Sequence, residues 1–318
     1  YLKLIMKKTI LVIPHRAIGD VIFQLPLIKI LNEQSRLIII SSPTNKCAEI
    51  LENFENTKVI YYDLLNKKNF SKIKFFFNFK RLLNTFNVDE IYFLARSTYI
   101  ILPILASKIK IKKLIYNSII ESKLSRKKFN STRPTKLTLD FIAKNFKIEP
   151  PNFYLFLDER KHEKQIKKFL DCKTPWIFFS IDSFHNAPNW DPKHYEELIS
   201  LASKYFSTVF VNTLPSHEFL LKNINQNKTP NIKFTSKLDW RSIMSIIKNS
   251  KIFVGNHSGP GHLADALNVR TIIVNNNLNK NALWSEKSAN IGKRSTYFNT
   301  WEFNEDYIKD YIVNEIKK

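Results

Sequence analysis

The stretch IFVGNHSGPGHLADALNVRTIIV, residues 252–274, carries the clearest structural signal in the sequence. An apolar run that ends at Val254 predicts a buried strand, and the run Thr271–Val274 predicts a second one. The intervening segment has helical spacing and begins with a turn that is rich in glycine. This order of strand, turn, helix and strand predicts a βαβ unit with parallel strands.

The turn of this stretch has the composition of an anion-binding site. Three of the five glycines of the protein lie in it: Gly255, Gly259 and Gly261. Glycine lets a ligand approach the backbone closely. A helix with Ser258 as N-cap and Pro260 in its first turn presents unpaired N–H groups to that ligand. We therefore expect a diphosphate between Ser258 and His262, although a structural turn with a core histidine stays open.

The same alternation of apolar runs and helical segments covers nearly the whole chain, which predicts an α/β protein with mostly parallel sheets. A length of 318 residues fits two domains. We expect an N-terminal Rossmann-like domain over residues 1–155, a C-terminal one over 156–300 and a final helix over 301–318. The paired prolines of IEPPNFYLFLDE (148–159) mark the connection.

The elements expected from this pattern can be given by their ranges. The expected strands are Thr9–Ile13, Leu37–Ser41, Lys58–Tyr62, Glu90–Leu94, Lys113–Tyr116, Trp176–Ile181, Thr208–Asn212, Ile252–Val254 and Thr271–Val274. The expected helices are Asp20–Leu31, Asn45–Asn53, Phe70–Phe86, Thr98–Ser107, Lys136–Phe146, Pro192–Tyr205, Ser216–Ile224, Trp240–Lys248, Pro260–Leu267 and Asn304–Ile316. Ligands of open α/β sheets bind at the carboxyl ends of the strands, so we expect the chemistry there.

Composition narrows the class of protein. Hydrophobic residues make up 44% of the chain, as in packed globular proteins. No apolar run approaches the ~20 residues of a membrane span. The YLKLI before Met6 is too short for a signal peptide and reads as an extension. Cys47 and Cys172 lack metal-ligand spacing, which favours free thiols in the reducing cytoplasm.

The formal net charge of +22 allows a nucleic-acid partner, because a basic surface attracts polyanions. Lys, Asn and Ile are abundant throughout, so biased residue usage explains part of this charge. The rest is concentrated between Lys108 and Lys136. No zinc, RNA-recognition or basic-zipper motif accompanies it, which makes nucleic acid the weakest of the partners considered.

A second turn, in HRAIGDVIFQLPLIKIL (15–31), follows the first expected strand. Asp20 stands at the start of the amphipathic helix of this turn. It can be a helix N-terminal carboxylate stabilised by the dipole, or a base that takes a proton from an acceptor hydroxyl. The turn lacks the G-x-G-x-x-G pattern, which argues against dinucleotide binding here.

Together these motifs resemble glycosyltransferase family 9, the lipopolysaccharide heptosyltransferase family. The resemblance rests on IGDVIFQLPLIKIL, NWDPKHYEELI and NHSGPGHLADALNVRTIIV, in this order along nearly the whole chain. It implies the GT-B fold, in which two Rossmann-like α/β domains face each other across a cleft. It also implies an inverting, metal-independent transfer of a sugar, without a cofactor.

The resemblance assigns roles to particular residues. It implies that Asp20 is the general base, and that His257, Ser258, Gly259 and His262 hold the phosphates and sugar of the donor. Two weaker assignments are Ser183, near the phosphates, and Glu218, at the donor ribose. For both, an exposed loop residue is the alternative.

The sequence departs from the family pattern at two positions. His257 stands where the family usually has Asp, which puts recognition of heptose in question. Pro188 stands where the family tends to have Lys, two residues before Trp190, so a phosphate-neutralising cation is missing. His185 is a substitute if protonated, although a lone loop histidine is more often solvated.

The sequence thus predicts a cytoplasmic glycosyltransferase. We expect it to move a heptose or other hexose-like sugar from a nucleotide diphosphate donor to lipopolysaccharide or another anionic surface glycan. The basic stretch Lys108–Lys136 adds a peripheral contact with the anionic inner face of the membrane as a further expectation. The alternative is a non-catalytic protein of this fold that binds nucleotide sugar or a partner.

Overall fold

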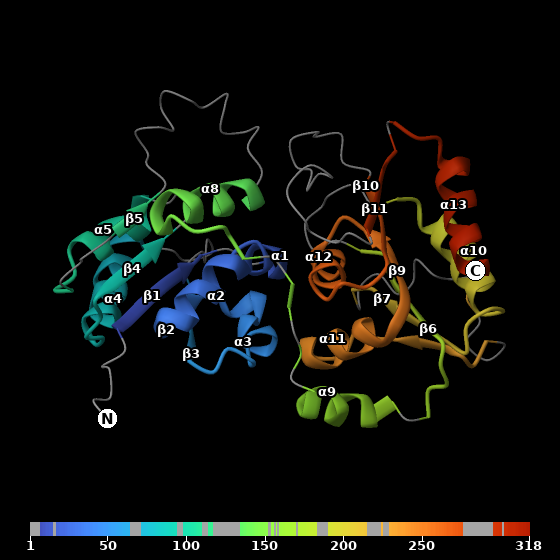
Figure 1. Cartoon of the computed structure of the whole chain (residues 1–318), viewed down its shortest axis with the longest axis horizontal. Coiled ribbons are helices and arrows are strands. Elements are labelled where there is room, and N and C mark those ends of the chain that lie inside the picture. Colours follow the sequence, from blue (N-terminus) through green and yellow to red (C-terminus); the bar gives the residue numbers. More distant parts are fainter. Residues whose placement is uncertain are drawn as a thin grey trace. The chain divides into compact units, whose positions relative to one another are not determined.

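The computed structural model describes most of the chain as two compact units, Tyr1–Pro151 and Asn152–Lys318 (Figure 1). The boundary falls within the proline-bearing segment 148–159. The described residues are 7–14, 17–63, 71–93, 98–109, 114–116, 134–151, 154, 155, 157, 159–169, 171–182, 190–214, 224, 229–275, 295–300 and 302–318. In this part of the chain, no helix is long and apolar enough to cross a membrane.

The first unit contains a five-stranded parallel sheet in the order β3-β2-β1-β4-β5. Its strands are β1 (Lys7–Ile13), β2 (Ser35–Ser41), β3 (Thr57–Tyr61), β4 (Glu90–Phe93) and β5 (Leu114–Tyr116). Its helices are α1 (Ile18–Ile22), α2 (Leu25–Gln34), α3 (Cys47–Ile50), α4 (Lys72–Asn84), α5 (Thr98–Leu105) and α8 (Pro134–Phe146), with a 3-10 turn at Pro43–Asn45.

Apolar side chains cover both faces of this sheet, as expected of parallel strands. On one face Ile10, Val12 and Ile91 form a core cluster with side chains of α4 and α5. On the other face the ring of Phe146 in α8 stacks on Tyr92 of β4, with 6.0 Å between ring centroids. Helices therefore flank the sheet on both sides (Figure 1).

The second unit contains a six-stranded parallel sheet in the order β11-β10-β9-β6-β7-β8. Its strands are β6 (Trp176–Ser180), β7 (Thr208–Asn212), β8 (Ile232–Phe234), β9 (Ser250–Asn256), β10 (Thr271–Asn275) and β11 (Ser295–Asn299). Its helices are α9 (Glu159–Ile166), α10 (Pro192–Ala202), α11 (Trp240–Asn249), α12 (Gly259–Ala266) and α13 (Glu305–Lys317), with a 3-10 turn at Lys167–Phe169. This is the strand order of the Rossmann fold.

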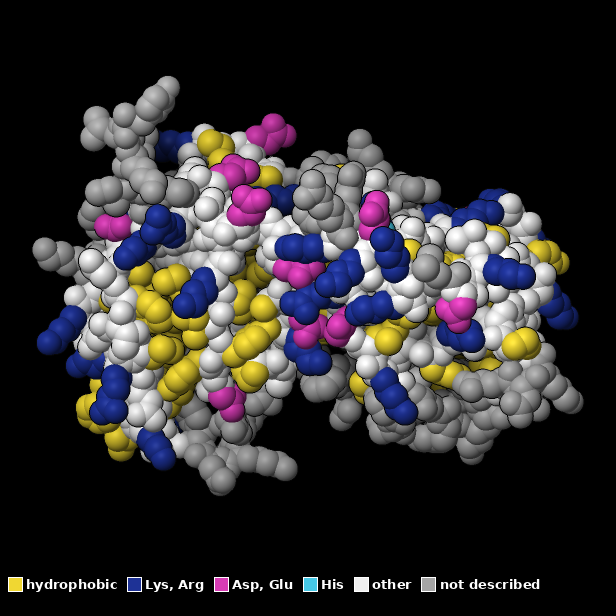
Figure 2. Space-filling view, turned by 90° about the horizontal axis from the view of Figure 1, so that it is seen from below, with side chains coloured by type: hydrophobic (Ala, Val, Ile, Leu, Met, Phe, Trp, Pro, Cys, Tyr) yellow, Lys and Arg dark blue, Asp and Glu magenta, His cyan; other side chains and the backbone are white. Residues whose placement is uncertain are grey.

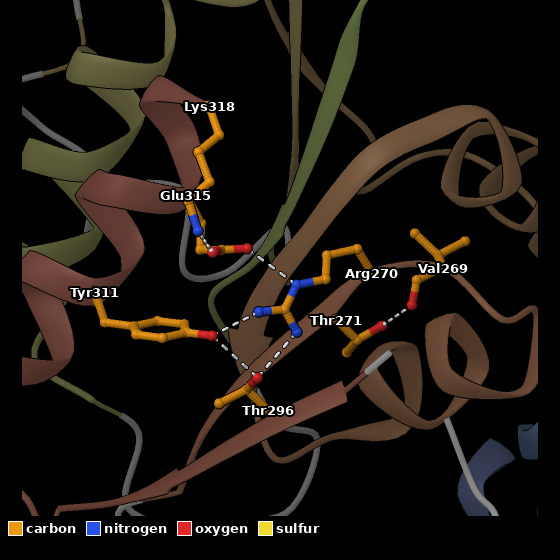
Figure 3. Close-up of polar contacts among 7 residues, drawn as sticks. All are labelled: Val269, Arg270, Thr271, Thr296, Tyr311, Glu315 and Lys318. Carbon is orange, nitrogen blue, oxygen red and sulfur yellow. Dashed lines mark hydrogen bonds and ion pairs between the residues drawn. The ribbon is translucent and has the colours of Figure 1, made fainter. Parts of the chain in front are cut away.

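Helix α13 belongs to the core of the second unit. Its residues Ile308, Ile312 and Ile316 are buried in the cluster that α10 shares with this face of the sheet. Arg270, just before β10, fastens the same helix through hydrogen bonds to Tyr311 (2.6 Å) and Glu315 (3.0 Å), and it also donates to Thr296 of β11 (Figure 3). Lys318 forms an ion pair with the same Glu315.

Two expected helices of the first unit were wrong in extent. The helix expected over Asp20–Leu31 is divided into α1 and α2 around Phe23 and Gln24. Pro26 lies in the first turn of α2, where its missing N–H costs nothing, whereas within one long helix it would break a hydrogen bond. The helix expected over Asn45–Asn53 shrinks to Cys47–Ile50, because Lys46 adopts a left-handed φ of 48°.

The structure also contains elements that the sequence pattern did not predict. Strands β8 and β11, helix α9 and the 3-10 turn at Lys167–Phe169 were not expected. Apart from these and the two helices named above, the described elements lie at or near the expected ranges. The expected helix Ser216–Ile224 falls almost wholly outside the described residues.

Strands β6 and β9 approach each other closely at Gly255, which is paired with Ser180. A Cβ at position 255 would lie 2.6 Å from the carbonyl oxygen of Ser180, whereas a Cβ at Gly261 would meet the Ile273 Cδ1 atom at 2.6 Å. A backbone atom in a sheet cannot give way as the end of a flexible side chain can.

We therefore expect Gly255→Ala to lower the free energy of unfolding by about 1–3 kcal/mol, more than Gly261→Ala does. Denaturant titration of both variants measures the difference. Equal costs would show that the β6–β9 contact is no tighter than the contact of α12 with β10.

Candidate active site

The candidate site of the second unit lies where the strand order reverses. Neighbouring strands β6 and β9 lead to connections on opposite sides, and α12 follows β9 directly. In sheets of this kind, ligands bind beyond the carboxyl ends of the two central strands. The glycine-rich turn singled out from the sequence occupies this position.

The side-chain amide of Asn256, the last residue of β9, joins three segments at this point. Its Nδ2 donates to the Ile181 carbonyl oxygen (2.6 Å). Its Oδ1 accepts from the Trp190 backbone N–H (3.1 Å) and from the Tyr195 hydroxyl (2.9 Å). Asn256 is only 3% exposed, so this buried amide fixes the end of β6, the start of α10 and the site turn relative to one another.

Ser258 is the N-cap residue of α12, as the sequence predicted, but its side chain does not cap the helix. Its backbone is extended, with φ −149° and ψ 173°, and its side chain makes no capping hydrogen bond. The Oγ atom is buried and has no hydrogen-bond partner within the described chain. By contrast, the N-cap carboxylate of Asp239 in α11 accepts from the Ser242 backbone N–H at 2.7 Å. A buried hydroxyl left without a partner is costly.

His257 and His262 meet edge to face beside Ser258, with 4.9 Å between their ring centroids. Burial lowers the pKa of His257 to about 4. Burial, and secondly the neighbouring His257, lower the pKa of His262 well below its ordinary value. Both imidazoles are therefore neutral at pH 7. The Nε2 of His257 is buried without a partner among the described residues, so two consecutive residues each carry an unpaired polar atom.

The two glycines of α12 differ in what the structure shows of them. Gly259 is the first residue of α12. Gly261 faces Ile273 of β10 so closely that a Cβ would collide with that side chain. The close approach that requires Gly261 is thus one between helix and sheet.

Sequence reasoning missed a polar pair beside this turn. Asp182, two residues beyond β6, is 5% exposed and accepts hydrogen bonds from the Thr213 hydroxyl and from the Leu214 backbone N–H (2.8 Å). It joins the ends of β6 and β7. The available signal was a carboxylate placed directly after a buried apolar strand, which is where α/β sheets carry their functional side chains.

Asp20 of the first unit lies in the first turn of α1, close beyond the carboxyl end of β1, and is half-buried. The Gln24 side chain donates through Nε2 to the Asp20 carbonyl oxygen (3.3 Å), while Gln24 Oε1 is buried without a partner among the described residues. Asp20 and the Ser258 turn thus both follow the carboxyl end of a central strand, β1 in the first sheet and β9 in the second.

The structure brings the predicted residues His257, Ser258, Gly259, Gly261 and His262 together at one end of the second sheet. Ser183 and Glu218 fall outside the described residues, as do Pro188 and His185. No cluster of His, Cys, Asp or Glu in the described ranges is placed to hold a metal ion.

One cavity of about 420 Å³ lies elsewhere, near the amino ends of β1, β2 and β3 in the first unit. Its lining includes Lys8, Arg36, Lys58 and Phe86. Asp20, by contrast, follows the carboxyl end of β1, so this cavity is remote from the predicted chemistry.

Solved structures of similar proteins show which fold the chain has. A glycosyltransferase family 9 protein from Veillonella parvula DSM 2008 has 12% identity and a TM-score of 0.70, with 98% of this chain and 92% of that chain covered. E. coli ADP-heptose lps heptosyltransferase II has 14% identity and a TM-score of 0.67, covering 98% and 100%. E. coli heptosyltransferase WaaC with ADP also has 14% identity and a TM-score of 0.67, covering 97% and 99%. The two parallel sheets thus have the GT-B fold.

The chain belongs to glycosyltransferase family 9 (heptosyltransferase), whose model matches residues 130–297. It is therefore a glycosyltransferase that uses a nucleotide-sugar donor. This confirms the family resemblance and the α/β fold inferred from the sequence. No curated protein sequence matches the chain significantly.

The unpaired Ser258 hydroxyl leads to an unusual expectation for an N-cap residue. Ser258→Ala removes an unsatisfied buried polar atom, so we expect the free energy of unfolding without ligand to stay within about 0.5 kcal/mol of wild type or to rise. Asp239→Ala, which removes a working cap, should cost about 1 kcal/mol. Thermal and denaturant unfolding of the two variants compare them. A loss at Ser258 as large as that at Asp239 would mean that Ser258 stabilises α12 as an ordinary cap.

The lowered pKa of His257 predicts a pH dependence of stability. Above about pH 6.5 the imidazole is neutral in both folded and unfolded states and contributes nothing. Between pH 6.5 and about 4 the unfolded state takes up the proton first, so folding stability falls as pH falls, by at most ~1.4 kcal/mol per pH unit. Asp265, whose pKa burial raises to about 6, acts in the opposite direction over part of this range.

The difference between wild type and His257→Gln removes the contribution of Asp265, which is common to both, and reports the loss of His257 together with its effect on the pKa of the neighbouring His262. Stability curves from denaturant titrations should run parallel above pH 6.5 and converge or cross below it, with the variant gaining relative stability in acid. Curves parallel down to pH 4 would show that His257 is not buried as a neutral ring.

Proposed function

We propose that the chain transfers a sugar, with inversion, from a nucleoside diphosphate sugar held at the start of α12 to a hydroxyl of an anionic glycan, with Asp20 as general base. The observation that carries this proposal is the pair of buried atoms without partners among the described residues, Ser258 Oγ and His257 Nε2, at the N-terminal end of α12. Diphosphate oxygens accept hydrogen bonds from the Ser258 hydroxyl, from the backbone N–H groups of a helix N-terminus and, in the tautomer with its proton on Nε2, from His257.

The first turn of α12 suits the leaving group. As the bond between the anomeric carbon and the phosphate oxygen breaks, negative charge builds up on the diphosphate. The N–H groups and the partial positive charge of the helix end face that charge, and their rigid attachment through Asn256 means that little reorganisation is needed. In this proposal the α12 terminus provides the stabilisation without a metal ion, as the family resemblance implies.

Asp20 completes the proposed reaction on the acceptor side. Its carboxylate takes the proton of an acceptor hydroxyl while the oxygen attacks the anomeric carbon on the face opposite the phosphate. One carbon–oxygen bond forms as the other breaks, and the configuration at the anomeric carbon is inverted. Base catalysis of this kind contributes about 10² to 10⁴ in rate.

His257 shapes the choice of donor. A neutral imidazole donates or accepts one hydrogen bond at Nε2 and brings no negative charge, unlike the Asp that the family resemblance leads one to expect there. The donor sugar is a heptose or another hexose-like sugar. E. coli WaaC was solved with ADP, which makes ADP and ADP-sugars the first compounds to test.

The acceptor in this proposal is lipopolysaccharide or another anionic surface glycan. The basic stretch Lys108–Lys136 provides a contact with the anionic inner face of the membrane, where a cytoplasmic enzyme meets a lipid-linked acceptor. Most of this stretch lies outside the described residues, whereas Lys108 is described and exposed. The proposed roles of Ser183 at the phosphates and Glu218 at the ribose also concern residues outside the described ranges.

The second candidate is a protein that binds nucleotide sugar without transferring it. His257 favours this candidate, because it removes the carboxylate expected at the donor. Sugar transfer from a labelled donor separates the two candidates.

One experiment compares the turnover and the nucleotide affinity of two variants. Nucleotides and their sugars are first ranked by thermal shift, since a ligand at 100 times its dissociation constant stabilises by about 2.7 kcal/mol. With the best donor, Asp20→Asn should lower turnover at least ~10²-fold at unchanged donor affinity, because it removes the base and keeps the shape. Ser258→Leu should instead weaken nucleotide binding in calorimetry, because it crowds the helix N-terminus.

Three results would contradict parts of the proposed function. Turnover of Asp20→Asn within a few fold of wild type would remove Asp20 from the mechanism. Unchanged nucleotide affinity of Ser258→Leu would place the donor elsewhere. Nucleotide binding by wild type without any transfer to a range of glycan acceptors would favour the non-catalytic candidate.

A further inference from the structure

Helices α4 and α5 lie together on one face of the first sheet. Phe75, Phe79 and Leu83 of α4 and Ile100 and Ile104 of α5 enter the same core cluster. The backbone N–H of Lys108, just after α5, donates to the Asn84 side chain at the end of α4 (2.6 Å). The two helices therefore form one layer, and the side chains on its inner side pack in the hydrophobic core.

The outer side of this layer is also apolar. Ile73 and Phe77, one turn apart on α4, are 72% and 61% exposed. Leu102 and Leu105, one turn apart on α5, are each 57% exposed. These four side chains define the α4–α5 face. Single exposed apolar residues are ordinary, but two such pairs on adjacent helices are not.

All the charge on this layer is positive. The basic residues of α4 and of the end of α5 are Lys72, Lys74, Lys80, Arg81 and Lys108. Neither helix contains Asp or Glu, and no ion pair among the described residues includes any of these cations. Figure 2 shows one side of the first unit, where apolar side chains gather and both basic and acidic side chains lie around them.

The positive charge and the exposed apolar side chains of the α4–α5 face together indicate which partner binds it. A second copy of this face would bring two sets of cations together, which costs free energy. Nucleic acid would match the charge and leave the four apolar side chains in water. An anionic bilayer matches both, because its headgroups attract the Lys and Arg side chains and its acyl boundary accepts the apolar ones. Snorkelling Lys side chains keep their charges at headgroup level.

We propose that the α4–α5 face is a docking surface for an anionic lipid bilayer. Helices in this role lie in the plane of the membrane with their apolar side chains at the headgroup boundary. This surface belongs to the first unit and involves neither Asp20 nor the α12 turn. It extends the membrane contact of the proposed function, with which it shares Lys108, to residues that the structure describes. The proposal can still fail while the proposed sugar transfer holds, and the reverse is equally possible.

Co-sedimentation of the full chain with vesicles tests the proposal without donor or acceptor. The vesicles are phosphatidylcholine alone, or phosphatidylcholine with one third phosphatidylglycerol. Wild type should bind the anionic vesicles and not the neutral ones. The double variant Ile73→Ser with Phe77→Ser should lower the partition coefficient at least ~10-fold, since it removes the most exposed apolar area. Lys74→Glu with Arg81→Glu should lower it similarly, and added salt should imitate this loss.

Matched controls come from the second unit. Tyr205 and Tyr307, 48% and 55% exposed, are changed to Ser, and Lys193 and Lys204 are changed to Glu. These variants should bind as wild type does. Circular dichroism and thermal unfolding check that all variants remain folded.

Three results would overturn the proposal. One is equal vesicle binding by the α4–α5 variants and wild type, and another is an equal loss in the controls. The third is a dimer in analytical ultracentrifugation that Phe77→Ser dissociates while no vesicle binding is seen, which would make a second copy the occupant.

Discussion

The second unit depends on a single buried amide. Asn256 forms hydrogen bonds with two segments that are distant in the sequence: it donates to Ile181 at the end of β6, and it accepts from Trp190 and Tyr195 at the start of α10. Because the amide is buried, each of these bonds would be expensive to lose. His257 and Ser258 follow Asn256 directly, so the hydrogen bonds of this amide also fix the position of the candidate-site residues. The site is rigid because its neighbour in the chain is.

The same region combines a satisfied polar group with unsatisfied ones. Asn256 has partners for both ends of its amide, whereas Ser258 Oγ and His257 Nε2, on the next two residues, have none within the described chain. Each unpaired buried atom costs about 1–3 kcal/mol in the free protein. A ligand that supplies partners recovers this free energy on binding. The arrangement favours binding over maximal stability, as is common at functional sites.

Part of this could be read from the sequence. The turn Gly255–Gly261 and the helix after it were predicted, because glycine, an N-cap residue and an early proline are local signals. The role of Asn256 was not, because an Asn after a strand reads as a turn residue, and its partners are 61 to 75 positions away. Pro26 was present in the expected helix Asp20–Leu31, but its effect depended on where α2 begins. Whether a buried hydroxyl finds a partner is settled only by tertiary packing.

The strand order of the second sheet also bears on how the chain is made. The apolar strand β6, with buried Trp176, Phe178 and Phe179, lies between β7 and β9. On the ribosome β7 emerges soon after it, but β9 arrives only once synthesis has passed Asn256, several seconds later at about 5–20 residues per second. For that time one edge of a hydrophobic strand is open. During this interval, which comes after the first unit has been completely synthesised, the open edge of β6 can pair with a strand other than β9.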